Sequence, residues 1–350
     1  MSAAETIALV RSRTSEVPSA LAETLRSAPP SLPANFFGKE LVATGLGSSQ
    51  AAARLLVAEL SERHACPASF RPMASFYMRV PKPEDRLLVV FTQGLSANAR
   101  VALEHAGDFA GVILVSSVTE AGLNAVGDWE RSDFLRQLKE SGAVIWTHPL
   151  EGEYTILPRF IGPACALAVA LRLADKLAGF DTFAPEALLR GDLDLGGCHD
   201  EGGWAEDLLA GVAFNFAGAW CEFAHNLGSK AMESLLRPPP ECRDLLEFSH
   251  GAFQVNELHP VPQWVFLDDT KESADLLDRV EPLLKRAPSY RVIRSPLSGR
   301  WAIFYFELFL NARVLHTMEQ MAIDLINWPG KGADGPAYSL KYPYHRIEPC

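Results

Sequence analysis

The sequence lacks the signatures of several common protein classes. Its six cysteines form no Cys-x-x-Cys pair, so neither a zinc ribbon nor a disulfide framework is indicated. We interpret them as reduced, mostly buried thiols: Cys66, Cys165, Cys198, Cys221, Cys242 and Cys350. A membrane-spanning helix needs roughly 20 consecutive apolar residues. The longest apolar run, residues 164–171, ends at Arg172, so no membrane span is predicted.

Targeting features and positive charge are also scarce. Six charged side chains within the first thirty residues interrupt any apolar core of a signal peptide. Acidic residues (43) outnumber Lys and Arg (32), and the formal net charge of −11 argues against nucleic acid or an anionic membrane as the main partner. We therefore expect a cytoplasmic protein without nucleic-acid or membrane partners, in which any anion-binding site is local.

The composition that is present is typical of a soluble globular protein. The 350 residues, 48% hydrophobic and 21% charged, are enough for two domains with sizeable cores. Short apolar runs typical of strands alternate with helical patterns, which predicts an α/β fold with parallel sheets. The predicted strands are residues 41–43, 65–71, 86–90, 112–116 and 143–147 in the first half and 210–216, 263–267 and 290–294 in the second.

The expected helices and boundaries follow from the same patterns. Residues 4–27 predict two short helices split at Glu16-Val17-Pro18, and apolar helices are expected at 163–176, 220–236 and 304–326. The last of these must be largely buried. We predict an N-terminal helical segment (1–38), two α/β domains (39–190 and 191–329) and a C-terminal tail (330–350). The similar halves suggest an internal duplication.

A turn rich in glycine and serine follows the first predicted strand. Gly45-Leu46-Gly47-Ser48-Ser49 end the apolar run, and a helical pattern begins at once. Glycines permit close backbone approach, and free N–H groups at a helix start attract an anion together with nearby hydroxyls. The turn lacks both the Gly-Lys-Ser/Thr of a nucleotide P-loop and the third glycine of a dinucleotide site. It predicts a phosphate-binding turn; a plain strand-to-helix turn with a serine cap is the alternative.

A second turn of the same build follows the strand at residues 86–90. Thr92-Gln93-Gly94-Leu95-Ser96-Ala97 supply hydroxyl, amide and glycine groups, and a helical pattern through residues 99–106 comes next. In a doubly wound sheet, ligands bind outside the carboxyl ends of the strands, at the point where the strand order reverses. We therefore expect a small phosphorylated ligand to bind between the two turns. The expected binding residues are Gly47, Ser48, Ser49, Thr92, Gln93, Gly94 and Ser96.

Several short motifs occur in an order that resembles the sugar isomerase (SIS) domain family. The family's first turn, roughly Gly-Thr-Ser, is matched by Gly47-Ser48-Ser49, and Thr92-Gln93 keep the character of the first two positions of its Ser-Gln-Ser-Gly-Glu-Thr. The remaining motifs are Lys-x-x-Glu at residues 230–233, Glu-x-x-His-Gly at 247–251 with Ala252 for proline, Asp-x-Pro-x-x-x-x-Lys at 334–341 and Glu-x-Pro at 16–18. The chain is similar to the isomerase half of glutamine:fructose-6-phosphate aminotransferase. This implies two tandem α/β sandwich domains of the SIS, flavodoxin-like type.

The resemblance also implies catalytic roles. Glu233 would carry the proton between C1 and C2 of the sugar, and partial burial would raise the pKa of this carboxyl toward neutrality. His250 would open the sugar ring; in the family this histidine comes from the neighbouring subunit, which implies a homodimer. Lys341 would act at the carbonyl carbon, by polarisation or as a Schiff base. No cofactor and no metal are expected, and the contiguous Cys198-His199-Asp200-Glu201 is interpreted as a loop.

Two classes of function remain open. The first is an enzyme, a phosphosugar isomerase or an aminosugar-phosphate deaminase acting on a hexose 6-phosphate by enediol or enamine chemistry; cleavage of a fructosamine phosphate shares that chemistry. Nothing after Met1-Ser2-Ala3 resembles the glutaminase domain of the synthase, so glutamine-dependent amino transfer is not expected. The alternative is a non-catalytic phosphosugar-binding sensor. A sensor would need only the two turns and would normally carry a DNA-binding helix-turn-helix.

Overall fold

The computed structural model describes residues 3–78, 80–149, 153–191, 193, 202–217, 221–321, 323–333 and 335. The chain forms two compact units. The five-stranded unit takes in the described residues within 23–153, 165–183 and 328–350, and the four-stranded unit those within 1–22, 154–164 and 184–327. Each unit contains one parallel sheet with helices, so the predicted α/β fold class is confirmed. The domain boundaries and the internal duplication stay predictions.

The five-stranded sheet has the strand order β2-β1-β3-β4-β5 and is parallel throughout. Its strands are β1 (Glu40–Gly45), β2 (Ala68–Phe70), β3 (Arg86–Phe91), β4 (Gly111–Ser116) and β5 (Val144–Thr147). All five were predicted from the sequence. The order reverses beside β1, which pairs with β2 on one side and with β3 on the other. The carboxyl ends of β1 and β3 are therefore the expected ligand-binding edge.

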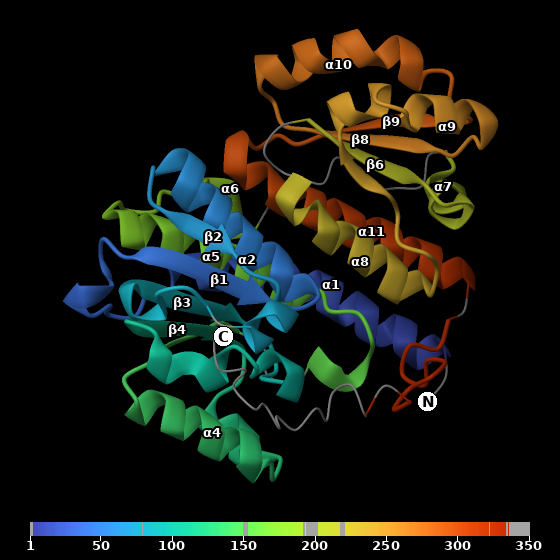
Figure 1. Cartoon of the computed structure of the whole chain (residues 1–350). Helices are drawn as coiled ribbons and strands as arrows, with labels where there is room; N and C mark the ends of the chain where they lie inside the picture. The colour runs from blue at the N-terminus through green and yellow to red at the C-terminus, as the bar shows by residue number, and fades with distance from the viewer. Residues whose placement is uncertain are drawn as a thin grey trace. The chain divides into compact units, whose positions relative to one another are not determined.

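Helices cover both faces of this sheet, as burial of a parallel sheet requires. On one face, Val42, Leu88 and Leu114 form a core with Leu135 and Leu138 of α4 (Trp129–Glu140). On the other face, α2 (Ser48–Ala58) packs along β1 (Figure 1). Helix α5 (Ile161–Ala178), predicted at 163–176, places Arg172 over the ring of Trp146 in β5, 5.5 Å from its centroid.

The four-stranded sheet is also parallel and has the order β7-β6-β8-β9. Its strands are β6 (Ala213–Phe216), β7 (Cys242–Asp244), β8 (Gln263–Leu267) and β9 (Tyr290–Arg294). In both sheets the first strand along the chain lies between the second and the third. Strand β7 was not predicted, because Cys242-Arg243-Asp244 has no apolar run; it forms as an edge strand by pairing with β6.

Alternate residues of β8 face two different layers. Val265 and Leu267 belong to a core with Leu277 and Val280 of α10 (Lys271–Leu284). The Phe266 ring meets Phe306 of α11 (Ala302–Met321) edge to face, with centroids 5.3 Å apart. Figure 1 shows α10 on one side of the sheet and α8 (Cys221–Leu235) and α11 on the other. Because both faces are buried, β8 is an almost continuous apolar run in the sequence, and this run predicted its bounds to the residue.

Helix α11 differs from the prediction in extent. It ends at Met321, not at 326; farther on, the Asp324 carboxylate accepts hydrogen bonds from the backbone N–H groups of Ile326 and Asn327 and stabilises a turn. Most of its side chains are buried, as predicted. The elements that bury the side chains of α11 include β8 and α8 of the same chain. The apolar character of α11 is therefore no evidence for a partner chain, although the sequence pattern alone would suggest one.

The amino-terminal region forms a single helix, α1 (Ala3–Arg26), with Pro18 inside it. The predicted division into two helices at Pro18 is wrong. Proline removes one backbone hydrogen bond, whereas Val10, Val17 and Leu21 are all buried along the helix. Packing of this apolar face stabilises the continuous helix more than the missing bond destabilises it.

The remaining helices are short. They are α3 (Glu120–Ala125), α6 (Glu186–Arg190), α7 (Trp204–Ala210) and α9 (Ala252–Leu258). Short 3₁₀-helices occur at Ala34–Phe36, Met73–Tyr77, Pro83–Asp85, Ala97–Ala99, Leu103–Asp108, Glu153–Thr155, Leu245–Ser249 and Gly299–Trp301, and a π-helical turn, Glu59–Arg63, extends α2.

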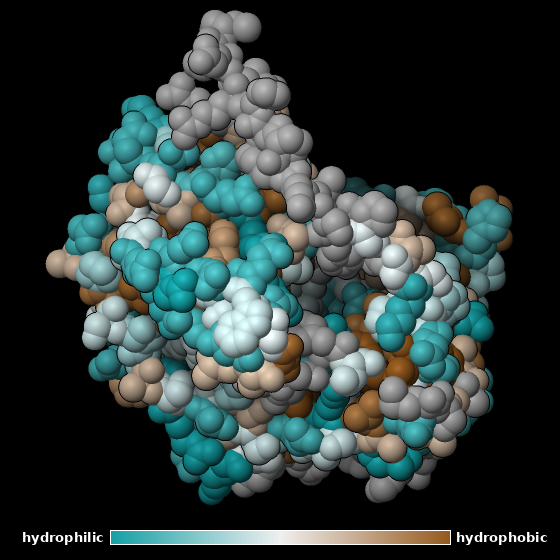
Figure 2. All heavy atoms as spheres, turned by 90° about the horizontal axis from the view of Figure 1, so that it is seen from below, coloured by the Kyte–Doolittle hydropathy of each residue, from teal (hydrophilic) through white to brown (hydrophobic). Residues whose placement is uncertain are grey.

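In the described part of the chain, no helix is both long and apolar enough to cross a membrane. On the face drawn in Figure 2, hydrophilic and hydrophobic residues are interspersed.

Candidate functional site

The first predicted phosphate-binding turn joins β1 to α2, as the sequence indicated. Gly45 is required there, because a Cβ atom on it would lie 2.5 Å from the backbone oxygen of Ser49. Gly47 precedes the helix with φ of 56°, a left-handed value that favours glycine. The N–H groups of Ser49 and Gln50 already donate to the carbonyls of Leu46 and Gly47. An anion at this turn would therefore rely on the serine hydroxyls and on the earlier amides.

The second turn follows β3 and is held by its own hydroxyls. Thr92 Oγ1 accepts a hydrogen bond from the Leu95 N–H at 3.1 Å, and Ser96 Oγ donates to Asn98 Oδ1 at 2.7 Å. Leu95 is fully buried with φ of 52°, an uncommon conformation for a non-glycine residue. Thr92 keeps its own hydroxyl proton to donate, whereas the Ser96 proton is already engaged.

No α-helix follows the second turn, so that prediction is wrong. The chain forms 3₁₀ turns at Ala97–Ala99 and Leu103–Asp108. The Arg100 N–H is shared between the carbonyls of Ser96 and Ala97, so the backbone bonds do not continue as a regular α-helical ladder. The second turn consequently lacks the aligned N–H groups and the dipole of a long helix.

Hydrogen bonds from the end of β4 and from α4 hold the middle of the second turn. The Gln93 carbonyl accepts from the hydroxyls of Ser116 (3.2 Å) and Ser117 (2.7 Å), and Arg131 donates to the Gly94 carbonyl at 2.6 Å. The Gln93 side-chain nitrogen is buried and has no hydrogen-bond partner among the described residues. A buried donor without a partner is costly and becomes stabilising when a ligand oxygen accepts from it.

The two turns lie at the same edge of the sheet. Gly45 and Phe91, the last residues of β1 and β3, are partners in the parallel register. The turns at 46–49 and 92–96 therefore leave from adjacent strands, as predicted.

Glu233 lies on α8, half-buried. None of the hydrogen bonds and ion pairs of the described residues involves its carboxylate. Burial raises the pKa of the Glu233 carboxyl, and the positive charges of Arg159 and Lys230 oppose that rise. This is the direction that the sequence predicted for a proton-transfer residue.

Lys230 of the Lys-x-x-Glu motif binds side chains of helix α11. Its ammonium group is buried and forms an ion pair with Glu307 of α11, and it also donates to Asn311 Oδ1 at 2.6 Å. Asn226 donates to the other carboxylate oxygen of Glu307 at 2.9 Å. Sequence reasoning missed Glu307, since nothing local connects residues 77 positions apart.

His250 is exposed and lies between the 3₁₀ turn Leu245–Ser249 and α9. Glu247 of the same motif has a structural role: with Asp244 it forms a capping box at the start of that turn. Three apolar side chains of this region, Leu246, Val255 and Leu258, are at least half exposed. Lys341 and most of its motif lie outside the described residues, as does the Cys198–Glu201 cluster.

The turn after β8 contains a buried carboxylate side chain. Asp268 is 3% exposed and accepts from the hydroxyls of Thr270 (2.7 Å) and Ser273 (2.6 Å) and from the Gly299 N–H (3.1 Å). These donors are of the kind that a bound phosphate would use, and a carboxylate already occupies them. This turn was not singled out from the sequence.

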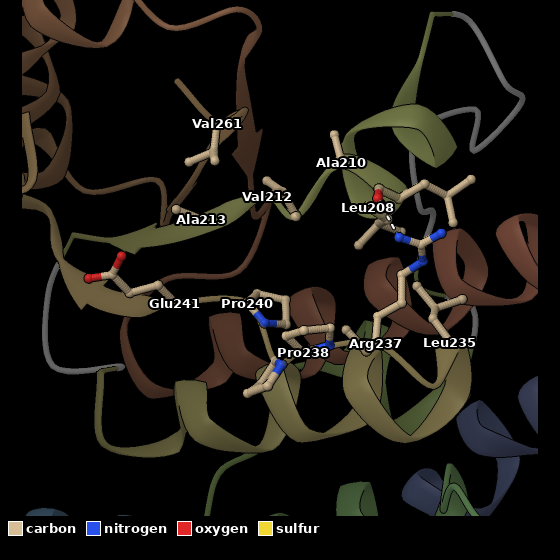
Figure 3. Close-up of a pocket in the computed structure, with 14 residues that line it drawn as sticks. Leu208, Ala210, Val212, Ala213, Leu235, Arg237, Pro238, Pro240, Glu241 and Val261 are labelled. Atoms are coloured by element: carbon tan, nitrogen blue, oxygen red, sulfur yellow. Dashed lines mark hydrogen bonds between the residues drawn. The ribbon is translucent and has the colours of Figure 1, made fainter. Parts of the chain in front are cut away.

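A groove of about 390 Å³ lies at the opposite, amino-terminal edge of the four-stranded sheet. Figure 3 shows Arg237 and the proline segment 238–240 on its wall, and Arg237 donates to the Leu209 carbonyl at 2.9 Å. None of the predicted site residues lines it. Within the described residues, no group of three His, Cys, Asp or Glu side chains is placed to hold a metal ion.

Solved structures with a similar fold are known. The C-terminal domain of glucosamine-fructose-6-phosphate aminotransferase from Francisella tularensis matches with a TM-score of 0.67 at 14% identity, over 89% of this chain and 96% of that one. Glucosamine-6-phosphate deaminase from Thermotoga maritima matches with 0.62 at 16% identity, over 91% and 97%. Tagatose-6-phosphate ketose/aldose isomerase from Escherichia coli matches with 0.57 at 17% identity, over 91% and 92%.

The chain has the fold of these SIS-domain proteins. This confirms the fold that the sequence resemblance implied. No family model matches the sequence, and no curated protein matches it significantly. Identities of 14–17% establish the fold and not the reaction, and the three structures are named for three different reactions.

Proposed function

We propose that this chain is an enzyme acting on a phosphorylated sugar, either as an aldose–ketose isomerase or as an aminosugar-phosphate deaminase. The observation that carries the proposal is Glu233, a half-buried carboxyl whose pKa is raised by burial and which no described side chain binds. Such a group can accept a proton from a substrate and return it. It stands at the position to which the family resemblance assigns the proton transfer, and structures of the same fold are named for reactions of this kind.

In this proposal the Glu233 carboxylate removes the proton at C2 of the open-chain aldose and returns it to C1. The electrons of the broken C–H bond form the C1=C2 double bond of an enediol while the carbonyl oxygen at C1 takes up a proton. Loss of the proton on the C2 oxygen, with protonation at C1, then gives the ketose. With an amino group at C2, the corresponding enamine takes the proton at C1 and becomes an imine at C2, which water hydrolyses to the C2 ketone and ammonia. His250 opens the cyclic form and Lys341 acts at the carbonyl carbon. Both of these roles rest on the resemblance.

The phosphate is assigned to the two turns of the five-stranded unit. The proposed ligands are Gly47, Ser48 and Ser49 on the first turn and Thr92, Gln93, Gly94 and Ser96 on the second. Thr92 supports the assignment because its hydroxyl proton remains free to donate, and the buried Gln93 amide because it lacks an acceptor. Binding energy from the phosphate would orient the reacting end of the sugar.

A homodimer is part of the proposal, because the resemblance brings His250 from a neighbouring subunit. The exposed Leu246, Val255 and Leu258 beside His250 support it, since a second copy of the chain would cover these apolar side chains. Sedimentation of the protein at micromolar concentration is expected to give a dimer. A stable, active monomer would contradict this part of the proposal.

A thermal-shift panel tests the ligand. We expect hexose 6-phosphates or amino-hexose 6-phosphates to stabilise the protein, by about 3 kcal/mol at a hundredfold excess over Kd. Unphosphorylated hexoses should not. Thr92→Val, which keeps the shape and removes the hydroxyl, should weaken binding about tenfold; Ser61→Ala, an exposed serine, is the matched control. Equal stabilisation by phosphorylated and unphosphorylated sugars would contradict the assignment of the phosphate to the two turns.

The second candidate is a phosphosugar-binding module without catalysis. It is favoured by one observation, the ion pair that occupies Lys230 of the Lys-x-x-Glu motif. Binding without any turnover of the bound sugar would decide for it.

A further inference from the structure

One peptide unit of the second turn, residues 92–96, is held by hydrogen bonds at both of its ends. The Gly94 carbonyl accepts from Arg131 Nη1 of α4 at 2.6 Å, and the Leu95 N–H donates to Thr92 Oγ1 at 3.1 Å. Because the Thr92 oxygen accepts this bond, its hydroxyl proton is directed to a different acceptor. The orientation of the peptide between Gly94 and Leu95 therefore influences where that proton points.

The backbone of Leu95 is strained in this orientation. Its φ is 52°, in the left-handed region that leucine seldom occupies. The side chain is buried in a core that includes Leu135 and Leu138 of α4, so a leucine is needed there for packing. Rotation of the 94–95 peptide changes ψ of Gly94 and φ of Leu95 together, and it can return φ to an ordinary negative value. The two hydrogen bonds oppose this rotation.

Arg131 is itself fixed at the start of α4. Asp128, the N-cap residue, accepts the Arg131 backbone N–H at 3.1 Å with one carboxylate oxygen and Arg131 Nε at 2.7 Å with the other. Glu130, the residue before Arg131, pairs with Arg100 beyond the turn at 2.8 Å. The chain after the second turn forms 3₁₀ turns and not an α-helix, so α4 supplies the contacts that fix its backbone.

We propose that Arg131 is a positioning residue for Thr92. By binding the Gly94 carbonyl, it keeps the 94–95 peptide in the orientation in which the N–H of that peptide reaches Thr92 Oγ1. The Thr92 hydroxyl proton is then directed toward the phosphate. The inference rests on the proposed function for the identity of the ligand, and on the hydrogen bonds alone for the coupling of Arg131 to the turn.

Amide hydrogen exchange of the free protein, followed by NMR, tests the coupling. In Arg131→Met, which keeps the aliphatic stem and removes the guanidinium, the Leu95 N–H should exchange about tenfold faster. The amides of β3 should keep their protection, because the sheet is untouched. Arg131→Lys, which retains a cationic donor, should restore part of the protection of Leu95. Arg136→Met is the matched control, since it removes an arginine of α4 that pairs with Asp133 and Glu140 of the same helix.

Two results of the exchange experiment would overturn the proposal. The first is unchanged exchange of the Leu95 N–H in Arg131→Met. The second is an equal acceleration throughout β3, which is the result expected if Arg131 only stabilises the fold.

Binding of glucose 6-phosphate, measured by calorimetry, tests the positioning role. Arg131→Met should weaken binding about tenfold, and Arg136→Met should leave it unchanged. In the Thr92→Val background, Arg131→Met should add less than about a threefold further loss, because both changes act through one hydroxyl. A full tenfold further loss in the double variant would mean that Arg131 acts on binding by another route, and the proposal would fall.

The two measurements separate this inference from the proposed function. If the Leu95 N–H responds as expected and the wild type binds no sugar phosphate, the coupling within the turn stands and the assignment of the phosphate to the turn fails. If the wild type and Arg131→Met bind glucose 6-phosphate equally well, the phosphate assignment stands and the positioning role fails.

Discussion

His148 should make the stability of this protein strongly dependent on pH. It directly follows β5 and is 3% exposed; its backbone N–H donates to the Ser116 carbonyl at 3.0 Å, and its ring Nδ1 lies 3.2 Å from the Pro149 carbonyl. Burial lowers the pKa of this imidazole from 6.5 to about 4. The folded protein therefore holds His148 neutral at pH values at which the unfolded chain has already protonated it.

The sign and the size of this pH dependence of the unfolding free energy follow from proton linkage. Between pH 6.5 and 4 the unfolded state binds more protons than the folded state, so acidification lowers the free energy of unfolding. With one pKa unit equal to about 1.4 kcal/mol, the loss from this residue is about 2 kcal/mol at pH 5 and about 3 kcal/mol at pH 4. The contribution is complete above pH 6.5.

Urea unfolding of the wild type and of His148→Asn, followed by tryptophan fluorescence, isolates this residue. Trp146 lies in β5, two residues before His148, so its fluorescence reports on the unfolding of this region. The variant cannot titrate at position 148, so the difference in unfolding free energy between the two proteins should shrink by about 3 kcal/mol from pH 7.5 to pH 4. A difference that is constant across this range would refute the reasoning, because it would mean that His148 titrates alike in both states.

Two further predictions concern the turns at the strand ends. Gly45→Ala places a methyl group against the Ser49 backbone and should destabilise the protein by about 2 kcal/mol and abolish phosphate-dependent stabilisation, whereas Gly107→Ala, which meets no atom within 4 Å, should do neither in a thermal-shift assay. Asp268→Ala leaves two hydroxyls and one N–H without their acceptor and should cost about 3 kcal/mol in urea unfolding; Asp269→Ala, at an exposed carboxylate, should cost less than about 1 kcal/mol. A loss from Asp269→Ala equal to that from Asp268→Ala, or a fully active and stable Gly45→Ala, would contradict these assignments.

The parts of the fold that could be predicted are those determined by local patterns. Strand β8 is a short apolar run, and the turn before α2 joins glycines to a helical pattern, so both are visible in a few consecutive residues. The parallel sheet then places the turns at 46–49 and 92–96 side by side without further information. Glu233 could be singled out because its motif is local.

The parts that could not be predicted depend on distant contacts. Residues 99–106 have a helical spacing of apolar residues, yet tertiary packing makes them 3₁₀ turns. Pro18 suggests a break between two helices, but burial of the apolar face of α1 stabilises one continuous helix. The ion pair of Lys230 with Glu307 joins two helices far apart in the sequence, so the motif alone could not show where the lysine is bound.

The most direct test of the proposed function is exchange of the C2 proton of the bound sugar phosphate with deuterated solvent, followed by NMR. We expect the wild type to exchange this proton, and Glu233→Gln to slow the exchange by about two to four orders of magnitude with little change in ligand affinity, because the variant keeps the shape of the side chain and loses the base. A wild-type protein that binds hexose 6-phosphates and exchanges no C2 proton would contradict the enzymatic function and leave a phosphosugar-binding module.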